Sequence, residues 1–294
     1  MGSNNDISLK ALAKINLGLD VVRRREDGYH EVRMIMQTIQ LYDRLDIKRT
    51  QEPGIQIQTN LSFLPVNENN LIYKAAKLLM DEFSITDGVS VKLDKRIPVA
   101  AGMAGGSTDA AAMLIGVNRL FSLGLTKRQL MERGVQIGAD VPYCIMRGTA
   151  LAEGIGEALS PLPPMVKCPV LIAKPSISVS TKFVYQNLKL DDTTIHPDID
   201  LLIEDDIKAK NLHDIAAHMG NVLETVTIPN YPVIDEIKKH MLSNGALGAM
   251  MSGSGPTVFG LFDNEDTAKK AYKAMRSSHL ARQVYLTSVY NNRK

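Results

Sequence analysis

The sequence of 294 residues contains two cysteines and no tryptophan. Cys144 and Cys168 are too few for a disulfide framework or a four-cysteine zinc site, and their spacing fits no CxxC pattern. Such sparse cysteine usage is typical of a reduced, cytoplasmic compartment. Aromatic residues make up 5% of the chain. The core must therefore be mainly aliphatic, and any exposed aromatic side chain becomes a candidate for ligand contact.

The chain also lacks an excess of either charge. Its 34 Lys and Arg residues against 32 Asp and Glu give a net charge of +2, so no overall field attracts a nucleic acid or a membrane surface. Residues 1–6 show neither the basic nor the apolar part of a secretory signal. No apolar run approaches the roughly 20 residues that span a bilayer. We therefore expect a cytoplasmic protein without nucleic-acid or membrane partners.

Hydrophobic periodicity predicts a mixed chain of strands and helices, long enough for one large or two ordinary domains. Apolar residues at every second position from Ile7 to Val21 predict a strand with one buried face, and Lys14 and Asn16 share its other face. The Asp27-Gly28 pair then predicts a hairpin turn. Further strands are predicted over residues 32–39, 45–49, 55–59, 89–93, 170–173, 257–262 and 283–289.

Helices are predicted in both halves. They cover residues 71–83, 110–121 and 233–242, a segment after residue 262, and a segment that opens with a Thr126 capping box and ends at Gly138. Residues 160–164 (SPLPP) are rich in proline and form the best linker candidate. We place a domain boundary there, which predicts domains of residues 1–160 and 161–294.

The strongest local signal is the glycine-rich stretch that follows Pro98. Gly102, Gly105 and Gly106 permit close backbone approach, and the predicted helix after them presents free N–H groups and the positive end of its dipole. This combination favours an anion site, most naturally for phosphates. An ordinary glycine turn fits the composition equally well, because the stretch contains neither a Walker A sequence nor GxGxxG.

Three further features carry weight only in combination. Lys14 lies in the first predicted strand, where it is otherwise a solvated lysine, and Asp140 lies in a small apolar turn, where it is otherwise a capping carboxylate. If the fold brings them together, the lysine holds the aspartate ionised beside a bound hydroxyl, as a phosphoryl acceptor requires. Residues 252–256 (SGSGP) are either a flexible turn or a second backbone nest for an anion. The six histidines show no metal-binding spacing, so we assign no metal cage.

Six segments, taken in chain order, match one family. They are residues 13–17 (AKINL), 25–31 (REDGYHE), 69–71 (NNL), 98–111 (PVAAGMAGGSTDAA), 138–142 (GADVP) and 251–256 (MSGSGP). Together they resemble the GHMP small-molecule kinases, and within that family the branch that phosphorylates 4-diphosphocytidyl-2-C-methyl-D-erythritol. The resemblance extends over almost the whole chain, from about Leu9 to Val289.

The resemblance implies a two-domain α/β (α+β) fold. An N-terminal domain like domain 2 of ribosomal protein S5 would precede a C-terminal GHMP kinase domain, with the active site in the cleft between them. It also implies transfer of the γ-phosphoryl group of ATP, with Mg²⁺, to the 2-hydroxyl of the cytidyl substrate, in the non-mevalonate route to isoprenoid precursors. The partners would be two small molecules, ATP and a cytidine diphosphate sugar alcohol, and we expect a monomer or a weak homodimer.

The resemblance assigns roles by position. Asp140 would orient and deprotonate the acceptor hydroxyl, Lys14 would keep Asp140 ionised, and Asn16 would hydrogen-bond the substrate near the reacting group. Mg²⁺ would be held mainly by phosphates, water and Ser107. The residues that would bind ATP are Pro98, Val99, Ala100, Ala101, Gly102, Met103, Ala104, Gly105, Gly106, Ser107 and Thr108 around the phosphates, with Asn70, Leu71 and Lys95 at the adenosine.

The cytosine of the substrate would have its own binding element. Tyr29 and Tyr185 would stack on the base, and His30 would hydrogen-bond its edge. A GHMP kinase for another alcohol, such as homoserine or mevalonate, is the nearest alternative, but a cytosine clamp has no purpose there. The other alternative is a non-catalytic module that senses a nucleotide or binds RNA. The presence of Lys14 and Asp140 argues against a sensor, and the balanced charge argues against RNA.

Overall fold

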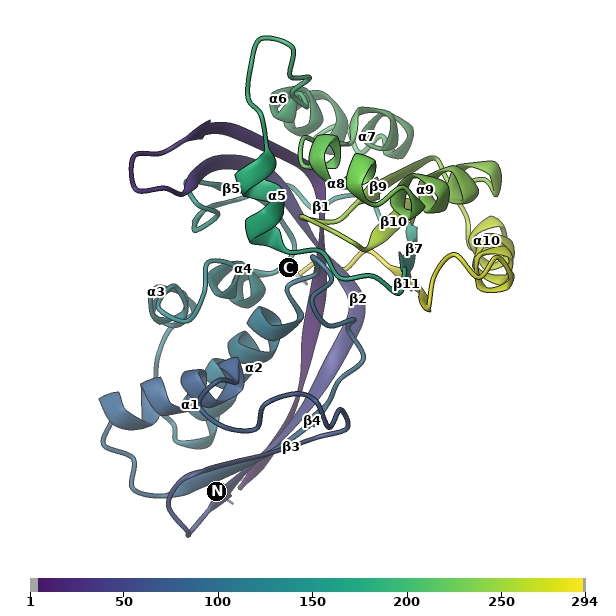
Figure 1. Ribbon diagram of the computed structural model, residues 1–294. Coiled ribbons are helices and arrows are strands. Elements are labelled where there is room, and N and C mark those ends of the chain that lie inside the picture. The colour runs from purple at the N-terminus through teal and green to yellow at the C-terminus, as the bar shows by residue number, and fades with distance from the viewer. Residues whose placement is uncertain (1–4, 293–294) are drawn as a thin grey trace. The chain divides into compact units, whose positions relative to one another are not determined.

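The computed structural model describes residues 5–292 and divides the chain into two compact units (Figure 1). Unit 1 contains the chain up to Ala13 together with Tyr42–Val99 and Ala104–Met146, and unit 2 contains Lys14–Leu41, Ala100–Met103 and the chain from Arg147 onward. The units interleave along the sequence, whereas the predicted domains meet at one point, residue 160. The prediction that residues 1–6 contain no secretory signal falls partly on residues 1–4, which lie outside the described residues.

Unit 1 contains a sheet in which β4, Gly88–Asp94, has a partner strand on each side. This strand pairs antiparallel with the second half of β2, His30–Thr50, and parallel with β3, Ile55–Thr59. In the register, Ile47 of β2 lies opposite Val91 of β4. Buried residues alternate along β4, which confirms the predicted strand.

Four helices of the described residues belong to this unit. They are α1 Leu71–Glu82, α2 Gly105–Leu120, α3 Lys127–Gly134 and α4 Val141–Met146. Of these, α1 and α2 lie against the sheet. Helices α1 and α4 both contact α2 (Figure 1). Gly116 lets α2 approach the sheet closely, because a Cβ there would lie 2.3 Å from Cδ1 of Ile47. The predicted Thr126 capping box before α3 is confirmed, and the Asn70 side chain caps α1.

Unit 2 contains the rest of β1, Asp6–Arg24, and of β2. The β2 strand pairs with β5, Thr149–Glu153, which pairs in turn with β6, Ala158–Pro161. The β1 strand pairs in parallel with the short β8, Gly220–Asn221. A separate antiparallel sheet has the order β11 Gln283–Ser288, β7 Pro169–Lys174, β10 Val258–Leu261 and β9 Gly248–Met251.

The helices of unit 2 follow β7 in the sequence, as the mainly helical pattern there predicts. They are α5 Thr181–Asn187, α6 Ile199–Leu201, the π-helix η1 Leu202–Ile207, α7 Leu212–His218, α8 Glu224–Asn230, α9 Val233–Ser243 and α10 Glu265–Ser277. Helix α9 packs on β9 and β10, and α10 packs on β7 and β11. Across residues 5–292 the structure contains no helix long and apolar enough to cross a membrane.

Several sequence predictions need correction. The prediction of one buried face on β1 is wrong in the middle of the strand, because Lys14 is 5% and Asn16 0% exposed. The two strands predicted over residues 32–39 and 45–49 form the single strand β2. The polar residues between the two predicted strands do not interrupt β2. Asp43, one of these residues, is buried and forms an ion pair within unit 1.

Three boundaries also differ from the predictions. Part of the proposed linker belongs to β6, whose backbone pairs with β5 and makes Ser160 and Pro161 part of a sheet. Helix α2 begins at Gly105, five residues before its predicted start, because the glycines adopt helical backbone geometry. Helix α3 ends at Gly134, since a turn through Gly138 leads directly into α4.

Candidate functional site

In unit 1, the second half of the glycine-rich stretch forms the first turn of α2. The N-cap residue, Ala104, has a left-handed φ of 54°, supplies no side-chain hydrogen bond, and is followed by no acidic residue in the first turn. The first N–H groups of a helix lack intrahelical acceptors and carry the positive end of the dipole. Gly105, Gly106 and Ser107 therefore present backbone donors suited to an anion.

Thr108 differs from its neighbours in this turn. Its amide donates to the Ala104 carbonyl at 2.8 Å, and its buried hydroxyl donates to the Leu12 carbonyl at 2.8 Å. This hydroxyl proton is therefore committed to β1 in the structure described, and a contact of Thr108 with the ATP phosphates stays a prediction. Thr108 fixes α2 to that strand.

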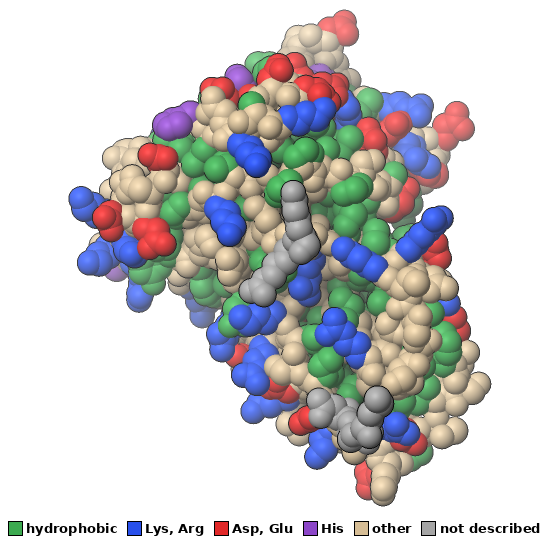
Figure 2. Space-filling view, turned by 180° about the vertical axis from the view of Figure 1, so that it is seen from behind, with side chains coloured by type: hydrophobic (Ala, Val, Ile, Leu, Met, Phe, Trp, Pro, Cys, Tyr) green, Lys and Arg blue, Asp and Glu red, His purple; other side chains and the backbone are tan. Residues whose placement is uncertain are grey.

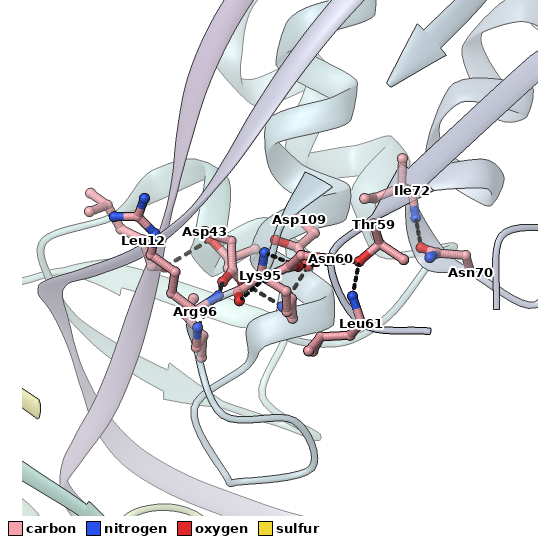
Figure 3. Close-up of polar contacts among 12 residues, drawn as sticks. Leu12, Asp43, Thr59, Asn60, Leu61, Asn70, Ile72, Lys95, Arg96 and Asp109 are labelled. Atoms are coloured by element: carbon pink, nitrogen blue, oxygen red, sulfur yellow. Dashed lines mark hydrogen bonds and ion pairs between the residues drawn. The ribbon is translucent and has the colours of Figure 1, made fainter. Parts of the chain in front are cut away.

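A buried ionic cluster lies beside the first turn of α2 (Figure 3). Lys95 donates from Nζ to Oδ2 of Asp109 at 2.6 Å and also contacts Oδ2 of Asp43. All three side chains are at most 4% exposed. Burial raises the pKa of Asp109, and the nearby Lys95 charge opposes that rise. Burial also lowers the pKa of Lys95, but the two carboxylates more than compensate, so its pKa is raised and the ammonium stays charged.

Of the residues predicted to line the adenosine pocket, Leu71 and Lys95 lie near the first turn of α2, and Asn70 lies at the start of α1. The Asn70 side chain accepts from Ile72 N at 2.9 Å and donates to the Pro65 carbonyl at 2.7 Å, so its amide caps α1 (Figure 3). Leu71 is adjacent to the glycine stretch, since a Cβ on Gly106 would lie 3.4 Å from its Cδ1. Lys95, in contrast, directs its ammonium into the buried cluster.

In unit 2, Lys14 and Asn16 form a buried pair on β1. Lys14 donates from Nζ to Oδ1 of Asn16 at 2.8 Å, and the Asn16 amide contacts Sδ of Met34 at 3.3 Å. The Lys14 amide donates to the Met103 carbonyl at 3.3 Å, which ties β1 to the first half of the glycine stretch. Asn16 therefore orients the ammonium of Lys14, and its contact with substrate stays a prediction.

The two glycine motifs of unit 2 pack against each other. The Ser252 hydroxyl donates to the Gly102 carbonyl at 2.9 Å. Gly102 has a φ of +70°, and a Cβ there would lie 2.0 Å from the Ser252 carbonyl oxygen. The Asn221 side chain donates to the Met251 and Gly253 carbonyls. Residues 252–256 are all buried, so the interpretation of this segment as a flexible turn is wrong; it supports the stretch around Gly102.

The rest of the first half of the stretch is less regular. Ala100 is exposed and has a left-handed φ of 50°. Pro98 and Ala101 are buried, and Val99 is half-buried. The buried residues Pro98 and Ala101 therefore anchor this segment, while Ala100 between them is exposed.

A pocket of about 1170 Å³ in unit 2 gathers the three residues of the predicted cytosine element. Tyr29 is 62% exposed at the β1–β2 turn, and the rings of His30 and Tyr185 lie 5.1 Å apart at an angle of 44°. The sequence analysis missed Arg24 and Lys182, which also line the pocket. Two sequence features could have indicated them: Arg24 belongs to the basic run before the Asp27-Gly28 turn, and Lys182 is close to Tyr185 in the sequence.

The protonation state of His30 suits a hydrogen bond to a neutral base. Burial, followed by the positive charge of Arg24, lowers the pKa of His30. The ring is therefore neutral near pH 7 and carries one donor and one acceptor nitrogen. A nucleobase edge presents donors and acceptors side by side, which matches this ring.

Asp140 is half-buried and immediately precedes α4, where its carbonyl accepts from the Cys144 amide at 3.0 Å. It belongs to unit 1, whereas Lys14 belongs to unit 2. The pairing of these two side chains stays a prediction. The sequence analysis missed Asp43 and gave Asp109 no role. Asp109 precedes an apolar helical run, a pattern that indicates a buried charged partner, whereas Asp43 lies in a polar stretch with Arg44 and Asp46 and has no such local signal.

Comparison with known proteins matches two family models to this chain. The model described as "GHMP kinases N terminal domain" matches residues 70–148, and "GHMP kinases C terminal" matches residues 203–281. The 4-diphosphocytidyl-2-C-methyl-D-erythritol kinase of Lachnospira eligens is 60% identical over 284 residues, covering 97% of this chain and 98% of the relative.

Solved structures agree with these matches. A crystal structure of 4-(cytidine 5'-diphospho)-2C-methyl-D-erythritol kinase superposes with a TM-score of 0.84 at 31% identity, covering 97% of this chain and all of the other. A homoserine kinase from Cytophaga hutchinsonii superposes with a TM-score of 0.78 at 19% identity, covering 99% of this chain and 96% of the other. The second likeness concerns the fold alone.

The contact between the glycine motifs predicts that alanine destabilises the protein more at residue 102 than at a glycine outside this contact. Gly102→Ala should lower the free energy of unfolding by more than Gly124→Ala, measured by urea denaturation. Both residues have φ near +70°, so both variants carry the left-handed backbone cost of about 1–2 kcal/mol. The Cβ at residue 102 also collides with Ser252, whereas residue 124 has open space. Equal losses in the two variants would contradict the packing described here.

Proposed function

The chain belongs to the GHMP kinase family, and from that membership we propose that it phosphorylates the 2-hydroxyl of 4-diphosphocytidyl-2-C-methyl-D-erythritol with ATP. The observation that carries this choice of substrate is the pocket shared by Tyr29, His30 and Tyr185. It supplies aromatic surface and a neutral hydrogen-bonding ring, which are the two elements that recognise a nucleobase. The product belongs to the non-mevalonate route to isoprenoid precursors.

The pocket also suits the charged part of this substrate. Arg24 and Lys182 line the same pocket as the aromatic residues, and basic side chains bind phosphate oxygens through charge-assisted hydrogen bonds. A pocket of about 1170 Å³ is larger than most small-molecule sites. The size and the basic residues together fit a nucleoside diphosphate better than a small uncharged alcohol.

ATP binds through its phosphates at the glycine stretch. The N-terminal amides of α2 supply donors for the phosphate oxygens, as helix N-termini do elsewhere. Leu71 lies next to this end of the helix, and together with Asn70, the N-cap of α1, it borders the adenosine. The glycines leave no side chain between the backbone and the phosphates.

Magnesium fits this site as an ion held mainly by the nucleotide. Over residues 5–292 there is no group of three or more His, Cys, Asp or Glu side chains that would form a protein cage, and Mg²⁺ commonly keeps several waters and binds substrate phosphates. Ser107, half-buried in the first turn of α2, would supply the protein ligand. When bound, the ion neutralises charge on the β- and γ-phosphates.

Lys14 and Asp140 form the catalytic pair. Asp140 accepts the proton of the 2-hydroxyl and orients its oxygen toward the γ-phosphorus. Lys14 keeps Asp140 ionised and stabilises charge on the transferring group, with its ammonium oriented by Asn16. Because phosphoryl transfer passes through a loose transition state, positioning and electrostatics account for most of their effect.

The remaining assignments concern partners and location. We place the enzyme in the cytoplasm, because ATP is available there and both cysteines, Cys144 and Cys168, are free thiols. Side chains of both charges occur on the face shown in Figure 2, which fits a protein without a nucleic-acid partner. We propose a monomer or a weak homodimer that acts on small molecules.

Asp140→Asn should fold and bind ATP but lose turnover by a factor of about 10²–10⁴, the usual contribution of a general base. The assay measures ADP formed from ATP, Mg²⁺ and the cytidyl substrate. Asp192→Asn, an exposed aspartate of the other unit, serves as the matched control and should keep the full rate. A rate in Asp140→Asn equal to that of the control would remove Asp140 from the mechanism.

Tyr29→Ala should raise KM for the cytidyl substrate by about 5–150-fold, since base–aromatic stacking contributes roughly 1–3 kcal/mol. KM for ATP should change little. Tyr272→Ala, on α10 and outside the pocket, is the control and should leave both constants unchanged. Parallel increases in the two KM values of Tyr29→Ala would show that Tyr29 does not contact cytosine.

A further inference from the structure

The two ends of the glycine stretch are tied together by the cluster of Asp43, Lys95 and Asp109 (Figure 3). Asp43 lies on β2 and accepts through Oδ1 from the backbone amides of Arg96 at 2.5 Å and Ile97 at 2.7 Å. Its other oxygen contacts the ammonium of Lys95, which also binds Asp109 on α2. The cluster thus connects the chain that enters the stretch with the helix that leaves it.

The ammonium lies directly against the first residue of α2. A Cβ on Gly105 would lie 3.0 Å from Nζ of Lys95 and 3.2 Å from Cγ2 of Ile97. A side chain at this position would require Lys95 and Ile97 to shift by a few tenths of an ångström, which glycine avoids. The position of Lys95 is further fixed through its backbone, since the Asn60 side chain accepts from its amide at 2.8 Å and donates to its carbonyl at 3.1 Å.

The charges of the cluster matter because an anion is expected at the same helix end. Counted with both carboxyl groups ionised, the cluster carries one net negative charge; burial, which raises the pKa of Asp109, acts against that charge. Among the described residues, Oδ1 of Asp109 has no hydrogen-bond partner. If Lys95 were absent, two uncompensated carboxylates would lie beside the first turn of α2. Their repulsion of a phosphate would be strong, because buried charges are weakly screened.

We propose that Lys95 is a positioning residue for the phosphates of ATP, which acts by offsetting negative charge on Asp109 and Asp43 and by holding the start of α2 against Ile97. It does so without touching the nucleotide: its side chain is 4% exposed and its ammonium is bound to two carboxylates. This role replaces the adenosine contact predicted from the resemblance. The inference rests on the proposed function in one respect, namely that the bound anion is ATP.

The test measures the dissociation constant of ATP by calorimetry without acceptor. Lys95→Met should weaken ATP binding about tenfold or more, within the range of coupling between adjacent sites. Asp109→Asn should bind ATP at least as tightly as the wild type. The double variant Lys95→Met with Asp109→Asn restores the net charge of the native cluster, and it should regain wild-type affinity to within about threefold. Lys92→Met, an exposed lysine on β4, is the charge-matched control and should bind normally.

Each outcome decides the inference. Unchanged ATP binding in Lys95→Met would overturn the inference. A loss of binding that the added Asp109→Asn substitution fails to rescue would also overturn it, because that result would indicate direct contact with the nucleotide or a purely structural role. If Lys95→Met does not fold, as judged by circular dichroism, Asp109→Asn alone decides, because weaker binding in that variant contradicts the electrostatic argument. Failure of the wild type to bind ATP would instead refute the proposed function.

Discussion

The ionic contact of Lys95 with Asp43 and Asp109 is the interaction on which the start of α2 depends. Breaking a buried ion pair by removing one partner typically costs about 3–5 kcal/mol, because the other charge stays buried without compensation. The cluster therefore holds its three elements, β2, α2 and the chain after β4, in one arrangement. The backbone donors at the α2 N-terminus are therefore held in fixed positions. Phosphoryl transfer depends on such preorganised donors.

In unit 2, close glycine packing and hydrogen bonds hold the residues of the site in place, where unit 1 uses buried charges. Ser252 and Asn221 bind backbone carbonyls around Gly102 and Gly253, and the Lys14 amide binds Met103. Lys14 is thereby fixed relative to residues 100–103 through the backbone, and its ammonium is oriented by Asn16. The pocket of Tyr29, His30 and Tyr185 lies in the same unit, so substrate recognition and the orientation of Lys14 share one framework.

The sequence predicted most elements, because alternation and helical periodicity are local properties. The β3 strand matches its predicted bounds, and Thr126 caps α3 as predicted. Periodicity failed where tertiary contacts override it: Asn16 is fully buried on a face expected to be solvated, and Pro161 belongs to β6 because β5 provides a partner. The family motifs located the glycine stretch and the cytosine element. They did not reveal the partners of Lys95, since Asp43 is 52 residues away in the chain and no local pattern connects them.

The proposed activity is tested most directly by phosphorus NMR of the reaction products. The protein is incubated with ATP, Mg²⁺ and, in separate samples, 4-diphosphocytidyl-2-C-methyl-D-erythritol, homoserine or mevalonate. The account predicts ADP and a new phosphomonoester signal with the cytidyl substrate, together with an intact diphosphate and a phosphate on the 2-oxygen. ADP formation with homoserine or mevalonate in place of the cytidyl substrate, or a phosphate at another position, would contradict it.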